Sequence, residues 1–191
     1  MPDLSIERRC SGLVAGIDEA GRGPWAGPVV AAAVILPADI SDALLTGLDD
    51  SKKLSAARRE ALLAELAGCA DIGIGAASVG QIERDNILAA TYAAMRRAVG
   101  GLSTVPDTAL IDGNRLPPDL PCRGQTVVKG DSLSLSIAAA SIVAKVTRDR
   151  IMASLATRYP AFGWERNAGY GTRQHQDGLA AEGITPHHRR T

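Results

Sequence analysis

Four acidic side chains form three sites at the predicted ends of strands: Asp18 with Glu19, Asp112, and Asp131. The ends of strands in an open α/β sheet are where ligands bind, so acids far apart in the sequence are expected to converge there. Carboxylates that lie close together repel one another at neutral pH unless a cation or a proton intervenes. Oxygen ligands favour Mg²⁺ or Mn²⁺, and two such ions can activate a water and stabilise the leaving oxygen of a phosphodiester. The four acids are therefore candidate catalytic residues and metal ligands.

A glycine-containing turn, Gly21-Arg22-Gly23, follows the first two acids. Glycine lets a backbone approach a ligand closely, and an arginine can pair with a phosphate. The triplet alone is also compatible with an ordinary turn. It is not a nucleotide-binding P-loop, because the chain contains no GxxxxGK and this G-x-G precedes no predicted helix. A cationic turn beside carboxylates indicates phosphate chemistry.

Each acid also has a purely structural interpretation. Asp112-Gly113 and Gly130-Asp131 are common turn dipeptides. Asp18 and Glu19 are adjacent, and adjacent residues on a regular strand point to opposite faces of the sheet. They can share one site only if the strand ends or bulges between them, and the nearby Gly21 favours such a break.

The elements that must position these residues are predicted from apolar periodicity and from capping residues. Strands are expected over residues 13–17, 27–36, 71–79, 108–111 and 126–129. Helices are expected over residues 56–66, 80–99, 132–158 and 172–182, with a loop over 163–172. Strands that alternate with helices after an initial hairpin predict an α/β fold, with a mixed central sheet flanked by helices.

Composition favours a single domain over residues 1–191, with a small C-terminal helical part from about 160 to 191. Basic and acidic residues balance at 21 each, so net charge gives no indication of a nucleic-acid partner. Three widely spaced cysteines and the lack of an apolar leader or membrane span favour a cytoplasmic protein, and a monomer is expected. Three histidines lack metal-ligand spacing and are predicted to lie at the surface or near phosphate: His175, His187 and His188.

The order of several motifs resembles the ribonuclease HII, or type 2 ribonuclease H, family. The motifs are GIDEAGRGPWAGPVVAAAV, DDSKKLS, LIDGN, VVKGDSLSLSIAAASIVAKVTRD, NAGYGT and TPHHRRT. Together they cover nearly the whole chain, from about residue 14 to 191, and their combination is specific although each motif alone is not.

The resemblance implies a ribonuclease H-like fold and a metal-dependent endonuclease. Such an enzyme cuts the RNA strand of RNA–DNA hybrids and nicks duplex DNA on the 5′ side of a single embedded ribonucleotide, leaving 5′-phosphate and 3′-hydroxyl ends. It implies that the four acids of the family correspond to Asp18, Glu19, Asp112 and Asp131. Our mechanistic hypothesis is that Asp18 bridges two Mg²⁺ or Mn²⁺ ions whose shells the other three acids complete. The resemblance also implies that Gly21-Arg22-Gly23 reads the ribonucleotide 2′-hydroxyl, the group that distinguishes RNA from DNA.

Further contacts to nucleic acid are implied for Tyr170, which would stack near the next deoxyribose, and for Lys52 and Lys53. The chain departs from the family at Ala168, where lysine is common, so a phosphate contact is lost or supplied elsewhere. Many members also continue past the equivalent of Thr191 into a short tail, where a clamp-binding peptide would lie.

Two alternatives come from other classes of protein. A non-catalytic nucleic-acid-binding domain would use the paired basic residues but has no need of four acids, which repel phosphate. A metal-dependent small-molecule phosphatase would use the acids but has no need of a 2′-hydroxyl reader.

Overall fold

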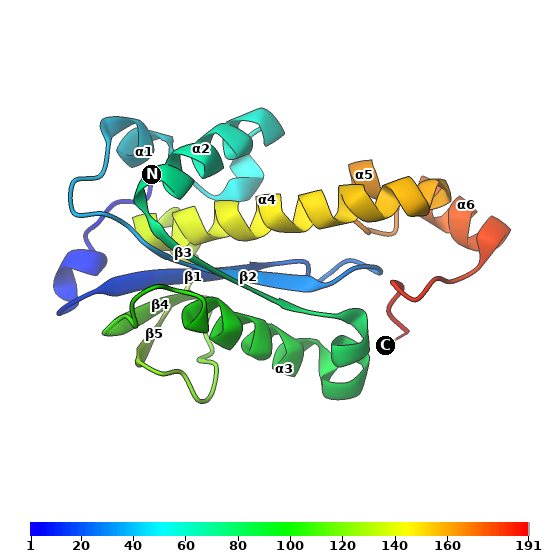
Figure 1. Cartoon of the computed structure of the whole chain (residues 1–191). Coiled ribbons are helices and arrows are strands. Elements are labelled where there is room, and N and C mark those ends of the chain that lie inside the picture. Colours follow the sequence, from blue (N-terminus) through cyan, green and yellow to red (C-terminus); the bar gives the residue numbers. More distant parts are fainter. Residues whose placement is uncertain (191) are drawn as a thin grey trace.

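A computed structural model describes residues 1–190, which form a five-stranded sheet with helices on both faces (Figure 1). The strands are β1 (Val14–Ala20), β2 (Val29–Ile35), β3 (Asp71–Ala77), β4 (Thr108–Asp112) and β5 (Arg123–Val127). Their spatial order is β3-β2-β1-β4-β5. Strand β1 pairs antiparallel with β2 and parallel with β4, so the sheet is mixed, which confirms the predicted fold class.

The helices are α1 (Asp42–Gly47), α2 (Ala56–Cys69), α3 (Val79–Gly100), α4 (Leu135–Arg158), α5 (Trp164–Asn167) and α6 (Arg173–Glu182). Short 3₁₀ helices are η1 (Glu7–Arg9), η2 (Ser51–Lys53), η3 (Gly130–Ser132) and η4 (Pro160–Phe162). Helices α1, α2 and α4 cover one face of the sheet and α3 covers the other (Figure 1). Within residues 1–190 no helix is both long and apolar enough to cross a membrane.

The small residues of the sheet explain how closely the helices approach it. A Cβ atom on Gly16 of β1 would lie 2.1 Å from the backbone carbon of Ser136 on α4. On the other face, a Cβ on Gly75 of β3 would lie 2.1 Å from the carbonyl oxygen of Ala94 on α3. The first of these contacts brings the N-terminal turns of α4 against the centre of the sheet.

Several predicted boundaries were wrong for local reasons. Helix α2 continues through Gly68, the predicted stop, because a glycine in a helix costs only about 1 kcal/mol and nothing there requires a left-handed residue. The strand expected over 126–129 begins earlier and ends at Val127, because Lys129 has a left-handed φ of 57°. The loop expected over 163–172 contains the short helix α5, and α1 was not predicted.

Helix α3 is also kinked near its start. Asn86 has a φ of 68°, and its side-chain oxygen accepts hydrogen bonds from the backbone N–H groups of Leu88 and Ala89. The amide therefore caps a second helical segment inside a stretch that was predicted as one continuous helix.

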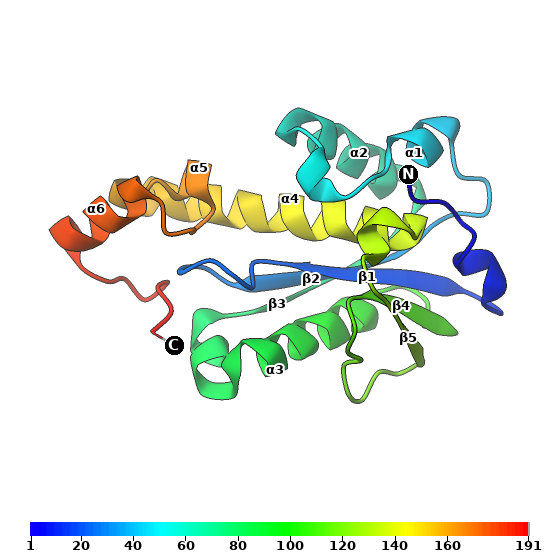
Figure 2. The same ribbon diagram turned by 180° about the vertical axis from the view of Figure 1, so that it is seen from behind.

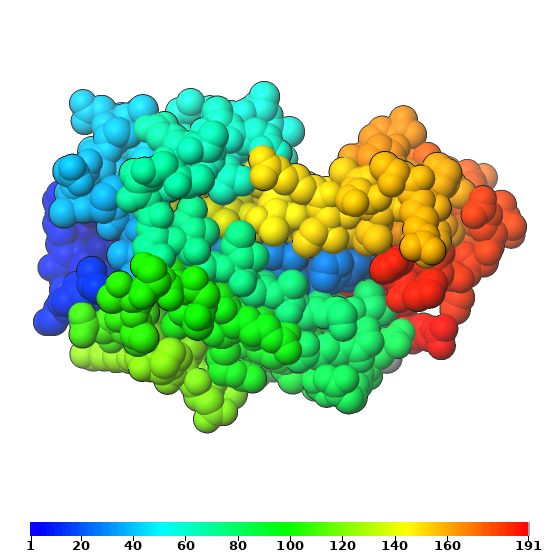
Figure 3. Space-filling view, in the orientation of Figure 1, coloured from blue at the N-terminus to red at the C-terminus, as the bar shows by residue number. Residues whose placement is uncertain are grey.

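The C-terminal elements η4, α5 and α6 pack at the far end of α4 (Figure 2). Buried side chains from both sides form this contact: Ala26, Met152, Ala156, Phe162 and Trp164. In the space-filling view the outline dips over α4 between α2 and this C-terminal group (Figure 3). The predicted helical part about 160–191 corresponds to these elements, with Thr191 outside the described residues.

Candidate active site

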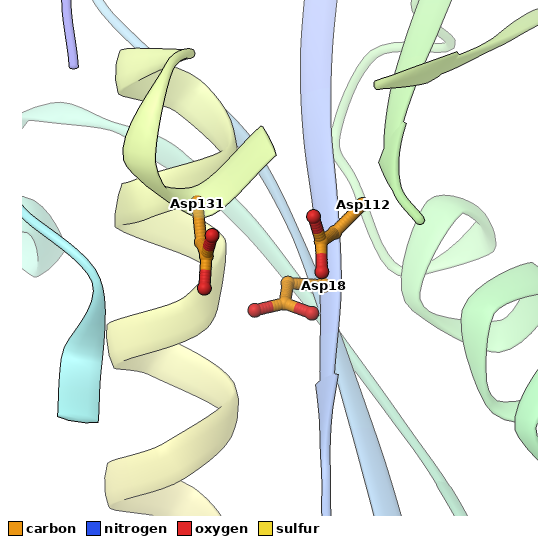
Figure 4. A group of neighbouring side chains, drawn as sticks. All are labelled: Asp18, Asp112 and Asp131. Carbon is orange, nitrogen blue, oxygen red and sulfur yellow. The ribbon is translucent and has the colours of Figure 1, made fainter. Parts of the chain in front are cut away.

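Three of the four predicted acids meet above the sheet. Asp18 comes from β1, Asp112 is the last residue of β4, and Asp131 lies in η3 just before α4. One carboxylate oxygen from each lies within 4.8 Å of the others, and Figure 4 shows the three side chains pointing toward one another. We refer to these residues as the three-carboxylate group.

The pairing of the strands explains this convergence. Parallel strands β1 and β4 pair Ile17 with Ile111, so the next residue of each strand, Asp18 and Asp112, lies at the same edge. Asp112 Oδ1 accepts a hydrogen bond of 2.7 Å from the backbone N–H of Gly130, which positions the η3 turn and its Asp131. Backbone pairing thus brings Asp18 and Asp112 together, and the side chain of Asp112 positions the turn that carries Asp131.

The electrostatics of the group favour a cation. Burial raises the pKa of Asp18 well above its usual range, and the negative charges of Glu19 and Asp112 raise it further. Burial, then Asp112, also raises the pKa of Asp131. In the part of the chain that the structure describes, the ion-pair partner of the group is Lys52, whose Nζ lies 3.9 Å from Asp131 Oδ2 on a side chain that is 80% exposed. Buried carboxylates with so little compensating charge fit a hard divalent ion.

Glu19 lies outside the three-carboxylate group. Strand β1 pairs with β2 without interruption from Gly16 to Ala20, so the expected break between Asp18 and Glu19 is absent. Glu19 therefore points to the α3 face, where it lines a cavity of about 330 Å³ with Asp112 and Tyr92. Its Oε1 accepts a hydrogen bond of 3.2 Å from Arg22. Asp112 lies close to both Asp18 and Glu19, and its negative charge raises the pKa of each.

The Gly21-Arg22-Gly23 turn follows β1 directly and opens no helix, as predicted. Gly21 has a φ of +97°, and a Cβ atom there would lie 1.9 Å from Nε of Arg148. Gly23 faces Tyr170, whose ring would be 3.6 Å from a Cβ atom at that position. The tyrosine side chain is 51% exposed. The turn and Tyr170 thus form one exposed surface.

A cavity of about 410 Å³ joins this surface to the acids. Its lining combines the predicted residues Asp18, Glu19, Gly21, Arg22, Gly23, Lys52 and Tyr170 with Ala20, Ser51, Ser141, Lys145 and Arg148. Lys53 does not line it; its Nζ lies 2.9 Å from Asp49 Oδ1 instead. Ala168 has a left-handed φ of 48°, and its carbonyl oxygen accepts a hydrogen bond from Arg148.

Sequence reasoning missed the roles of several polar residues around the cavity. Ser141 donates a hydrogen bond of 2.7 Å to Ser51, which links α4 to η2 beside Asp18. Lys145 lies one helical turn further along α4 and pairs with Asp149. Ser141, Lys145 and Arg148 are spaced four and three residues apart, which places them on one face of α4. This spacing could have been recognised in the sequence.

The histidine prediction was wrong for two residues. His175 is fully buried and His188 is 4% exposed, and their Nε2 atoms lie 2.9 Å apart. An aromatic cluster with Phe162 and Trp164 surrounds them. Sequence spacing could not reveal this pair because the two rings come from α6 and from the chain beyond it.

A mixed sheet whose strand ends bring three acids together beside a glycine-containing turn defines a metal-dependent nuclease with a ribonuclease H-like fold. The ribonuclease HII family profile matches residues 15–191. The chain is 62% identical to the ribonuclease HII of Rhodospirillum rubrum over 192 residues, covering 99% of this chain and 88% of that one. The chain therefore belongs to the ribonuclease HII family, whose members are endoribonucleases that degrade the RNA of RNA–DNA hybrids.

Solved structures support the same assignment. The ribonuclease HII in the PCNA complex from Archaeoglobus fulgidus superposes with a TM-score of 0.75 at 29% identity, covering 93% of this chain and 94% of that chain. The ribonuclease H2 of Pyrococcus horikoshii OT3 superposes with a TM-score of 0.77 at 26% identity, covering 93% and 92%.

Proposed function

We propose that this member of the ribonuclease HII family, in addition to cutting hybrids, nicks duplex DNA on the 5′ side of a single embedded ribonucleotide. The products would carry 5′-phosphate and 3′-hydroxyl ends, and the reaction would serve ribonucleotide removal during DNA replication and repair. The observation that carries the proposal is the shared cavity, which joins the acids to the Gly21-Arg22-Gly23 turn and Tyr170. A cutting group and a sugar-reading group in one cavity favour cleavage at a defined sugar.

Asp18, Asp112 and Asp131 of the three-carboxylate group would hold the Mg²⁺ or Mn²⁺ ions. When bound with substrate, such ions lower the pKa of a water and stabilise the leaving oxygen of the phosphodiester. Glu19 would join as the fourth ligand once Arg22 releases it. Once the ion pair between Glu19 and Arg22 has separated, Arg22 would be free to pair with a substrate phosphate.

The exposed surface at the turn would recognise the sugar. Backbone groups at Gly21 and Gly23 are suited to the 2′-hydroxyl because glycine leaves them accessible. Tyr170, half exposed beside Gly23, would pack against the neighbouring deoxyribose. Lys52 and Lys145 line the same cavity and would contact phosphates, with Lys145 supplying charge that Ala168 lacks. Lys53 would contact the nucleic acid only outside the cavity.

The partners of the protein would be RNA–DNA hybrids and DNA duplexes that contain ribonucleotides. We infer that the protein acts as a monomer, because the three acids, the turn and Tyr170 already meet within the fold of one chain.

One assay tests the proposal. The protein is incubated with Mg²⁺ or Mn²⁺ and, separately, a duplex with one ribonucleotide, the same duplex in all-DNA form, an RNA–DNA hybrid and a small phosphomonoester. The expected result is a single nick 5′ of the ribonucleotide and cleavage of the hybrid's RNA strand. Hybrid cleavage without that nick would refute the proposed specificity, and release of phosphate from the monoester would favour a phosphatase.

A further inference from the structure

The chain returns after α6 to the tip of the β1–β2 hairpin, and Figures 1 and 2 both show this approach. We call residues 185–190 the return segment. The backbone N–H of Gly27 donates to the carbonyl of His187 at 2.8 Å, and the N–H of Arg189 donates to the carbonyl of Trp25 at 2.8 Å. The return segment therefore lies beside the turn between β1 and β2 like a short added strand.

The Arg189 side chain completes this contact. Its guanidinium donates to the carbonyl oxygens of Gly21 at 2.5 Å, Arg22 at 2.8 Å and Gly27 at 2.8 Å. Burial lowers the pKa of Arg189 only to about 10, so the group stays charged at neutral pH. Hydrogen bonds from a charged donor are stronger than neutral ones. Here the bonds to Gly21 and Arg22 fix the backbone of the proposed sugar-reading turn, and the bond to Gly27 fixes the chain just before β2.

A second connection runs from the return segment to Tyr170. The backbone N–H of Thr185 donates to Nδ1 of His188 at 2.9 Å, so a neutral His188 carries its proton on Nε2. That proton is donated to Nε2 of His175 at 2.9 Å. The proton of His175 is then on Nδ1, which donates to the carbonyl oxygen of Tyr170 at 2.9 Å. Every polar atom of the two buried rings has a partner in this arrangement.

We propose that Arg189 and the His188–His175 pair are positioning residues that hold the Gly21-Arg22-Gly23 turn and Tyr170 in register with each other. The proposal rests on the proposed function for the role of these two elements in reading the ribonucleotide. The turn and Tyr170 lie about 150 positions apart in sequence. The return segment is bonded to the turn through Arg189, and it reaches Tyr170 through His188 and His175.

The test uses the full chain with R189A and H188F, and with R190A as the matched control. Arg190 is adjacent and exposed, so R190A removes the same charge without disturbing the turn. H188Q restores an N–H donor near the position of Nε2, whereas H188F keeps ring volume without donors. R189K keeps the positive charge but replaces the several N–H donors of the planar guanidinium with a single ammonium group.

Three quantities are measured: the nicking rate constant at a single ribonucleotide per folded molecule, amide hydrogen exchange over 20–28 and 168–172, and Mn²⁺ binding without substrate. R189A is expected to lose about 100-fold in the rate constant, the scale of a misplaced substrate-binding group. Exchange over the two segments should rise, Mn²⁺ binding should stay within about twofold, and R189K and H188Q should recover part of the loss. R190A should match wild type in the ratio of nicking to hybrid cleavage.

Unchanged exchange over 20–28 and an unchanged rate constant in R189A and H188F would overturn the proposal. A lower melting temperature with normal exchange and rate would overturn it too, because a merely structural role predicts that result. If R189A does not fold, the same measurements on H188F and R189K test the proposal. Should wild type cut hybrids but not nick at a ribonucleotide, the proposed specificity fails, while the exchange data still decide whether the return segment orders the turn.

Discussion

Asp18 and Glu19 are consecutive on β1 and lie on opposite faces of the sheet. Asp18 faces α4 and joins Asp112 and Asp131, whereas Glu19 faces α3 and pairs with Arg22. The fold thus brings three acids together and places a fourth acid beside the turn that is proposed to read the substrate.

This separation predicts different behaviour for variants of the two residues. Asp18→Asn should abolish cleavage and weaken Mn²⁺ binding without substrate at least tenfold, because it removes a ligand from the assembled group, while hybrid binding largely persists. Glu19→Gln should also abolish cleavage but keep Mn²⁺ binding near wild type. Calorimetry on the metal-free protein measures this difference. Loss of Mn²⁺ binding in E19Q would mean that Glu19 already belongs to the three-carboxylate group. Full activity in D18N would rule out a catalytic role for Asp18.

The repulsion among the acids predicts that the carboxylates proposed to bind metal lower the stability of the folded protein. Asp18 has a raised pKa in the folded protein, so its ionised form destabilises the fold as pH rises through that pKa. Asp18→Asn should therefore raise the melting temperature at pH 7 without metal. Added Mg²⁺ should raise the melting temperature of wild type and do so less in Asp131→Asn. Scanning calorimetry with and without Mg²⁺ measures both; a D18N protein less stable than wild type would contradict the prediction.

Gly21 and Gly113 provide a matched pair for the turn. Both have positive φ, +97° and +101°, but a Cβ atom on Gly21 would collide with Arg148 whereas Gly113 has open space around it. Gly113→Ala should cost about 1 kcal/mol from backbone strain alone. Gly21→Ala should cost roughly 3 kcal/mol, because Arg148 must also give up its place. Urea unfolding curves compare the two, and equal costs would show that Arg148 moves freely.

The buried histidine pair predicts a dependence of stability on acid. Burial, then the neighbouring His175 and His187, lowers the pKa of His188 to about 4 from 6.5. Because the unfolded chain takes up the proton first, the stability that His188 contributes is complete above pH 6.5 and is lost as pH falls toward 4. The loss should approach about 3 kcal/mol, at 1.36 kcal/mol per pKa unit. Unfolding free energies at pH 6.5 and 4.5 should differ less in H188Q, and an equal difference would refute the assignment.

Much of the site could be predicted from the sequence because it depends on local signals. Asp18 and Asp112 end or nearly end apolar runs, so their place at a sheet edge follows once the strands are found. The side on which Glu19 points could not be predicted, because it depends on whether pairing with β2 continues past Asp18. The contacts of Arg189 could not be predicted either. An arginine that donates only to backbone carbonyl oxygens cannot be distinguished in the sequence from an exposed basic residue.

The pairing of β1 with β4 has a consequence for how the protein folds. The backbone N–H of Leu13 donates to Asp107, 94 positions away, at the point where the two strands meet. Contacts over such separations close large loops and form late and slowly compared with helices. A refolding chain should therefore regain its helical signal well before Asp18 and Asp112 are adjacent, and nuclease competence should be among the last properties to return.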